Sequence, residues 1–99
     1  MTILLDELQE RWRAIFRALA AGDDVAPAQR LRTEGMMEAA LLLEPDGQQQ
    51  LLRAMESCYE SAFGQSIAAM HGKNWRSFFP FPQIPAMARR APVFPSTSD

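Results

Sequence analysis

The chain has 99 residues, of which 47% are hydrophobic and 22% are charged, a composition typical of one small globular domain. Ten basic and twelve acidic side chains leave a formal net charge of -2, which lacks the positive field that favours nucleic-acid binding. The single cysteine, Cys58, excludes an internal disulfide and a cysteine-based zinc site, and it indicates a reducing cytoplasmic setting.

Neither an export signal nor a membrane span is expected. Residues 1–12 have no basic start, and Asp6 and Glu7 interrupt their apolar run. The longest apolar stretch, residues 36–43, is interrupted by Glu38 and is far shorter than the ~20 residues that cross a bilayer.

Apolar residues spaced three and four positions apart predict an amphipathic helix over residues 3–21. Its apolar face consists of Leu4, Leu5, Leu8, Trp12, Ile15, Phe16 and Leu19. On the opposite side, Glu7 with Arg11 and Glu10 with Arg13 have the spacing of helical ion pairs. Such pairs contribute little, so burial of the apolar face is expected to decide whether this helix forms.

A second helix is predicted to start after Asp23 or Asp24, either of which can cap it, with Pro27 in its first turn, and to end at Leu43. One side carries Ala28, Leu31, Gly35, Met36, Ala39, Leu42 and Leu43, and another carries Met37, Ala40 and Leu41. Two apolar sides indicate two neighbours. Gly35 costs about 1 kcal/mol relative to alanine inside a helix, a penalty that the close approach of another helix would offset.

A third helix is predicted from a cap at Asp46 to Gly64, and its apolar residues share one side. They are Leu51, Leu52, Met55, Cys58, Tyr59, Ala62 and Phe63. Residues 66–71 have room for one or two further helical turns, and Asn74 is the expected cap of another.

Beyond Phe78 the composition changes, because closely spaced prolines exclude a long helix and a central strand. The prolines are Pro80, Pro82, Pro85, Pro92 and Pro95, and the apolar residues among them are Phe79, Phe81, Ile84, Met87, Val93 and Phe94. A solvated tail would avoid so many apolar side chains. The pattern leaves open whether this arm packs on its own helices, on a sister subunit or on a different protein.

Charge is divided along the chain. Residues 1–60 hold eleven acidic and six basic side chains, whereas residues 61–99 hold four basic and one acidic side chain. Arg89 and Arg90 place positive charge in the proline-rich arm. The arm could therefore dock on an acidic surface of its own chain, of a sister chain or of another protein.

Glu34 and Glu38 lie on a narrow strip between the two apolar sides of the second helix. We expect them to pair with Arg30, Arg32 or an arginine of a partner. A metal pair held by helix carboxylates would need Glu-x-x-His spacing, but the residue three positions before His71 is an alanine. No metal site is predicted.

Residues that could carry catalysis are sparse. His71 is the only histidine, and Cys58 sits at the edge of an apolar helix side with no sign of an activating base. The scattered glycines do not form a phosphate-binding loop. We therefore assign no catalytic residue, no metal and no cofactor, and we expect nucleic-acid binding to be disfavoured.

These patterns predict an all-α fold with three to four helices. Residues 1–77 are expected to form the helical domain, and residues 78–99 the proline-rich arm. Because the second helix has two apolar sides and the core is small, we expect a homodimer.

The predicted function is that of a non-enzymatic interaction module, a small cytoplasmic, bacterial-type regulator or adaptor that binds a larger protein. One example is an antagonist of a transcriptional regulator. The alternatives are an accessory subunit of a multi-protein enzyme and a DNA-binding repressor. The predicted partner contacts are Glu34, Met37, Glu38, Leu41, Trp75, Phe79, Phe81, Arg89 and Arg90.

Overall fold

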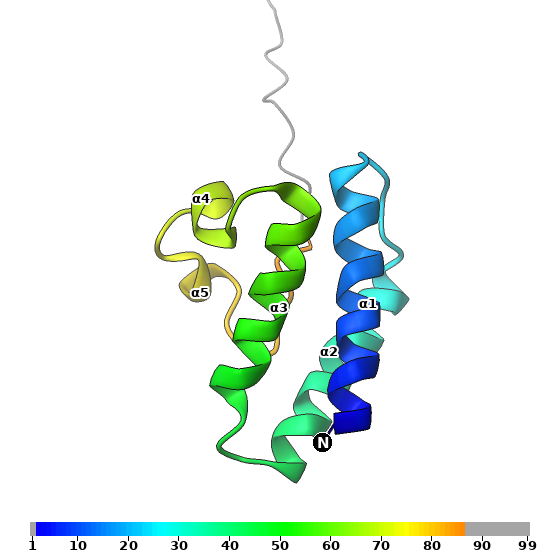
Figure 1. Ribbon diagram of the computed structural model, residues 1–99, viewed down its shortest axis with the longest axis vertical. Coiled ribbons are helices and arrows are strands. Elements are labelled where there is room, and N and C mark those ends of the chain that lie inside the picture. The colour runs from blue at the N-terminus through cyan, green and yellow to red at the C-terminus, as the bar shows by residue number, and fades with distance from the viewer. Residues whose placement is uncertain (1, 87–99) are drawn as a thin grey trace, which may run out of the picture.

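The computed structural model describes residues 2–86, and over this range the fold is entirely helical, which confirms the all-α prediction (Figure 1). The helices are α1 (Thr2–Ala20), α2 (Pro27–Leu43), α3 (Gln48–Phe63), α4 (Ile67–His71) and α5 (Trp75–Phe78). None of them is both long and apolar enough to span a bilayer. Arg89 and Arg90 lie outside the described residues.

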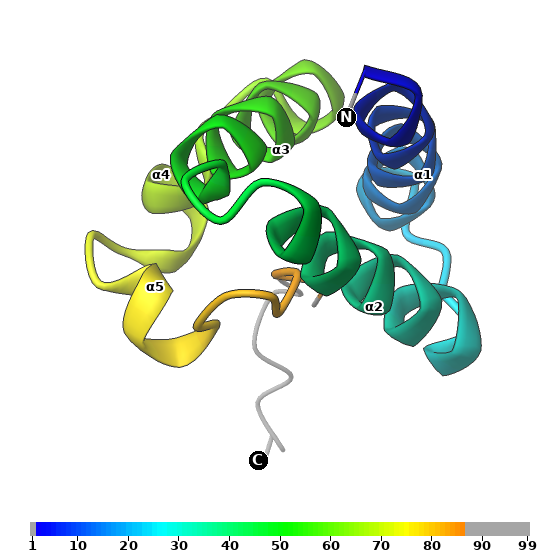
Figure 2. The same cartoon turned by 90° about the horizontal axis from the view of Figure 1, so that it is seen from below.

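The three long helices alternate in direction and surround a common core. α1 packs against both α2 and α3. Seen end-on in Figure 2, the three helices stand at the corners of a triangle, with α4 and α5 beside α3. The segment after α5 then crosses the open side of this triangle and reaches α2 (Figure 2).

The core is built from the apolar faces that the sequence predicts for the first and third helices. α1 buries Leu8, Trp12, Ile15, Phe16 and Leu19, and α3 buries Leu51, Leu52, Met55, Cys58 and Tyr59. Phe16 meets Tyr59 edge to face, with ring centroids 4.9 Å apart. Each large side chain buried in this way contributes about 1.5–3 kcal/mol, so these two faces hold the bundle together.

Two helix starts differ from the prediction. α2 has Pro27 in its first turn and ends at Leu43 as predicted, but its cap position is Ala26 instead of Asp23 or Asp24, and no side chain caps its first turn. Proline suits that position because a first-turn N–H has no partner inside the helix. α3 begins after Gly47, and Asp46 is not its cap.

Two other local predictions are confirmed. Arg11 and Glu7 pair at 3.1 Å, and Arg13 and Glu10 pair at 3.2 Å, on the exposed side of α1. At these exposures each pair contributes little to stability.

The described part of the proline-rich arm packs on the chain's own helices. Ile84 is only 2% exposed and belongs to the core, and Phe79 and Phe81 are half-buried against it. A turn closed by the Gln83 N–H, which donates to the Pro80 carbonyl at 2.8 Å, redirects the chain toward α2. Residues 79–86 therefore cover a side of the bundle that the three long helices leave open.

Candidate functional site

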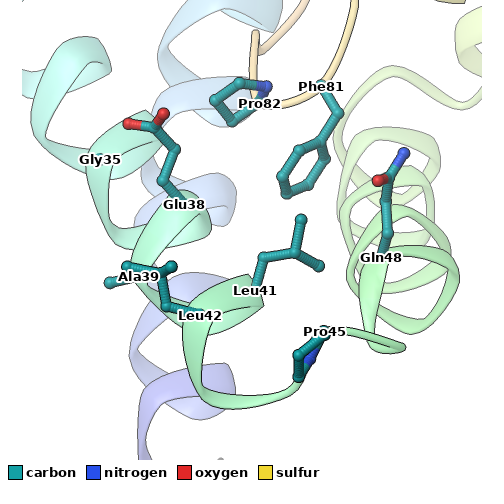
Figure 3. Close-up of a pocket in the computed structure, with 9 residues that line it drawn as sticks. All are labelled: Gly35, Glu38, Ala39, Leu41, Leu42, Pro45, Gln48, Phe81 and Pro82. Carbon is teal, nitrogen blue, oxygen red and sulfur yellow. The ribbon is translucent and has the colours of Figure 1, made fainter.

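An open groove with a volume of about 970 Å³ runs along the C-terminal half of α2 and is the candidate functional site (Figure 3). Its lining consists of Gly35, Glu38, Ala39, Leu41, Leu42, Pro45, Gln48, Phe81 and Pro82. α2 forms one wall, and the segment after α5 forms the other. In Figure 3 the Phe81 ring points toward Leu41, while Pro45 and Gln48 border the end of the groove near the start of α3.

Both walls follow from local sequence. Gly35, Glu38 and Leu42 recur at helical spacing, so they fall on the same outer side of α2. On the other wall, Pro80 and Pro82 flank Phe81 and prevent α5 from continuing through it. The groove is thus a helix face opposed by a non-helical, aromatic segment.

A buried carboxylate ties the two walls together. Glu34 is 8% exposed, and its Oε2 atom accepts a hydrogen bond from the backbone N–H of Ile84 at 2.8 Å. Arg30 Nη1 donates to the same carboxylate at 3.1 and 3.2 Å. Hydrogen bonds to charged groups contribute about 1.5–3 kcal/mol, so Glu34 fixes the position of the segment that carries Phe81. The predicted pairing of Glu34 with Arg30 is confirmed, whereas its bond to the arm was not predicted.

Glu38 lies one turn further along α2, is exposed, and lines the groove. No hydrogen bond or ion pair joins its side chain to any described residue, so the expected pairing with Arg30 or Arg32 is not made within residues 2–86. Its carboxylate is therefore available to a bound molecule.

The structure brings three of the predicted contact residues into one site. Glu38, Leu41 and Phe81 all line the groove, although Phe81 comes from a segment remote in sequence from the other two. Phe79 lies nearby in the chain but turns toward α4, where its ring is 5.6 Å from that of His71. Arg89 and Arg90 remain predictions outside the described residues.

Two predicted contact residues are buried in the core instead. Met37 has 0% exposure and Trp75 has 4%. Met37 lies on the side of α2 that faces the bundle, and Trp75 starts α5 with its ring in the core. The expectation that they form an accessible contact surface is corrected, since neither can reach a partner without opening the fold. Glu34, at 8% exposure, likewise serves the fold and not a free surface.

Gly35, Ala39 and Leu42 line the groove but were not chosen as contacts from the sequence. The signal was present, because these residues form the first of the two apolar sides predicted for the second helix. Periodicity alone did not reveal which of the two sides faces the core. The structure turns Met37 and Ala40 inward and leaves Leu42 84% exposed.

Cys58 and His71, the two reactive side chains considered in the sequence, lie outside this groove. The thiol of Cys58 is buried, and this burial raises its pKa above the ordinary value of 9.0, against the opposing effect of Arg13 and Arg17. Nε2 of His71 lies 3.2 Å from the hydroxyl of Tyr59. Within residues 2–86, no three His, Cys, Asp or Glu side chains are placed to hold a metal ion.

Comparison with known proteins shows no matching family model, no matching curated protein and no matching solved structure.

Proposed function

We propose that this chain is a small, cytoplasmic, non-enzymatic interaction module that binds a segment of a larger protein in the groove along α2. The observation that carries the proposal is the meeting of Glu38, Leu41 and Phe81 in one open groove. Each was chosen from the sequence as a partner contact, and they come from two separate segments of the chain. By occupying a surface of its partner, such a module modulates that partner, for example as an antagonist of a transcriptional regulator.

Exposed leucines on α2 could supply binding energy for such a partner. Leu42, which lines the groove, is 84% exposed, and Leu31 and Leu43, which lie on α2 outside the groove lining, are 56% and 67% exposed. Covering such side chains stabilises a complex by up to about 1.5–3 kcal/mol for each residue that becomes fully buried. Large apolar side chains gathered on one face are typical of protein-binding surfaces.

An accessory subunit and a homodimer would use the same groove along α2. An accessory subunit of a multi-protein enzyme would bind its catalytic partner in the same way, and only the identity of the partner distinguishes it from a regulator. The homodimer expected from the sequence stays a prediction, and it would place a second copy against α2, where Gly35 leaves room for a close helix contact. A DNA-binding repressor is less well supported, because no basic residue lines the groove.

The test compares groove variants that keep the fold with a control outside the groove. Adding a Cβ to Gly35 meets no atom within 4 Å, so Gly35→Leu should fold normally while its side chain projects into the groove and obstructs the helical wall. Leu42→Ala removes an exposed groove residue, and Phe78→Ala removes a side chain that is 70% exposed on α5, outside the groove.

Each variant is used as bait in a lysate of the source cells, and the captured proteins are quantified by mass spectrometry. A protein that is retained by the parent chain and by Phe78→Ala, but lost with Gly35→Leu and reduced with Leu42→Ala, supports the proposal. Equal capture by all four baits would contradict it.

A further inference from the structure

We infer that the groove takes a basic amphipathic helix, a helical segment of another protein that lays apolar side chains on Leu41, Leu42 and Phe81 and places a lysine or arginine beside Glu38. The inference rests on the proposed function and names the chemistry of the bound segment. It depends on three features: the sign of the charge around the groove, the small residues in its helical wall, and the poor fit of a second copy.

Glu38 is the only charged side chain that lines the groove within residues 2–86. Glu44 and Asp46 follow in the turn between α2 and α3, and the opposing wall, residues 79–86, carries no charge. The C-terminal end of α2 adds the negative end of a helix dipole, and its last turn holds no basic side chain to offset it. A cationic side chain is the complement of this surface.

Arg30 and Arg32 both precede the groove on α2, and neither lines it. Arg30 is committed to the buried Glu34 carboxylate, with both carboxylate oxygens within 3.2 Å of its Nη1 atom. Glu38, one turn later, has no such partner among the described residues. The Glu38 carboxylate, which has no ion-pair partner within residues 2–86, therefore faces the groove.

The helical wall of the groove is shaped for a second helix. Gly35 and Ala39 are one turn apart on it, both exposed, and the space beyond Gly35 is open. Helices pack at interaxial distances of about 8–10 Å, and the smaller side chains permit the closer approach. Leu41, Leu42 and Phe81 then border this contact as apolar anchors (Figure 3). This arrangement corresponds to recognition of an amphipathic helix in a groove.

A second copy of this chain is a poorer occupant. In a symmetric antiparallel pair of α2 helices, Gly35 would face Ala39 across an axis near Met37. The two-fold axis places the same side of each α2 helix on the same side of the interface. The two Glu38 carboxylates would therefore lie close together. Like charges at an interface oppose association, whereas a basic segment of a different protein relieves the same acidic surface.

The probe is a displayed library of random 16-residue peptides selected on the full-length chain. We expect selected peptides to combine apolar residues at helical spacing with lysine or arginine, and to lose binding to Gly35→Leu. For a synthetic copy of a selected peptide, calorimetry should show affinity about 2–5-fold lower with Glu38→Gln. Glu38→Lys should lower it at least ~10-fold, and added salt should weaken binding to the parent chain.

The matched control is Glu60→Gln, which neutralises an exposed carboxylate on α3 outside the groove and should leave peptide affinity unchanged. Peptides that require an open Gly35 but show no basic enrichment and no response to Glu38→Gln would overturn the inference and leave the proposed function standing. If no peptide binds and the chain sediments as a dimer that Gly35→Leu dissociates, the occupant is a second copy and the inference is wrong.

Two further results would also overturn the inference. Peptides that bind only after Arg89 and Arg90 are replaced by serine would identify the chain's own C-terminal segment as the occupant. If no peptide binds the parent chain or that variant and the chain is a monomer, the inference and the proposed function both fail.

Discussion

Replacing Glu34 by alanine should lower the free energy of unfolding by about 2–4 kcal/mol. The buried carboxylate accepts the Ile84 N–H at 2.8 Å, a charged hydrogen bond of about 1.5–3 kcal/mol. Removing the carboxylate leaves the Ile84 N–H without its acceptor, and Ile84 is only 2% exposed. An unsatisfied buried N–H costs about 1–3 kcal/mol, and this cost partly counts the same interaction as the hydrogen-bond energy above. The half-exposed Arg30 adds at most about 1 kcal/mol.

Urea unfolding followed by tryptophan fluorescence measures this change, because Trp12 and Trp75 are both buried in the folded chain. Glu34→Gln should fall between the parent and the alanine variant, since an amide oxygen can still accept from the Ile84 N–H. The matched control is Glu38→Ala, one turn away on the same helix, which should change stability by no more than about 0.5 kcal/mol.

Equal stability of Glu34→Ala and Glu38→Ala would show that the hydrogen bond between Glu34 and Ile84 does not stabilise the fold. A second readout is the groove itself, because detaching Ile84 from α2 releases the wall that carries Phe81. Binding of a selected peptide should therefore weaken in Glu34→Ala under conditions where the variant is still folded.

Gly35→Ala should stabilise the fold by about 0.5–1 kcal/mol, since the added methyl group meets no atom within 4 Å; a lower melting temperature in calorimetry would refute this. Tyr59→Phe should cost about 0.5–1.5 kcal/mol in urea unfolding, because the hydroxyl loses its contact with His71, and an unchanged midpoint would show that the contact contributes nothing. Cys58 should react slowly with iodoacetamide at pH 7–8 and faster in urea, because burial raises its thiol pKa and leaves little thiolate; rapid labelling of the folded chain would contradict this.

The same pKa shift predicts a loss of stability at alkaline pH. Because the folded chain holds the Cys58 proton more tightly than the unfolded chain, ionisation begins in the unfolded state as the pH approaches 9.0. The stability that the protonated Cys58 thiol contributes is fully present below pH 9.0, and it is lost as the pH rises through the pKa of Cys58 in the folded chain. Cys58→Ser should remove this thiol-dependent part of the pH profile in urea titrations, and an identical alkaline slope in both proteins would argue against it.

Sequence patterns alone determined the parts of this protein that depend on local periodicity. Apolar spacing identified the buried faces of α1 and α3, because a helix with one apolar side can be packed in only one orientation. Proline placement likewise predicted that helix would stop near Phe78. The position of Pro27 in the first turn of α2 was predicted, but the cap was misassigned, because aspartates that can cap a helix also occur in loops.

Tertiary structure determined the features that the local spacing of apolar residues could not. α2 has apolar residues on two sides, and only its packing against α1 shows that Met37 faces inward while Leu42 stays exposed. The bond between Glu34 and Ile84 joins residues 50 positions apart, a contact that no helical or strand period encodes. The groove exists because that bond holds a proline-rich segment against a helix, so its position depends on the folded arrangement of both.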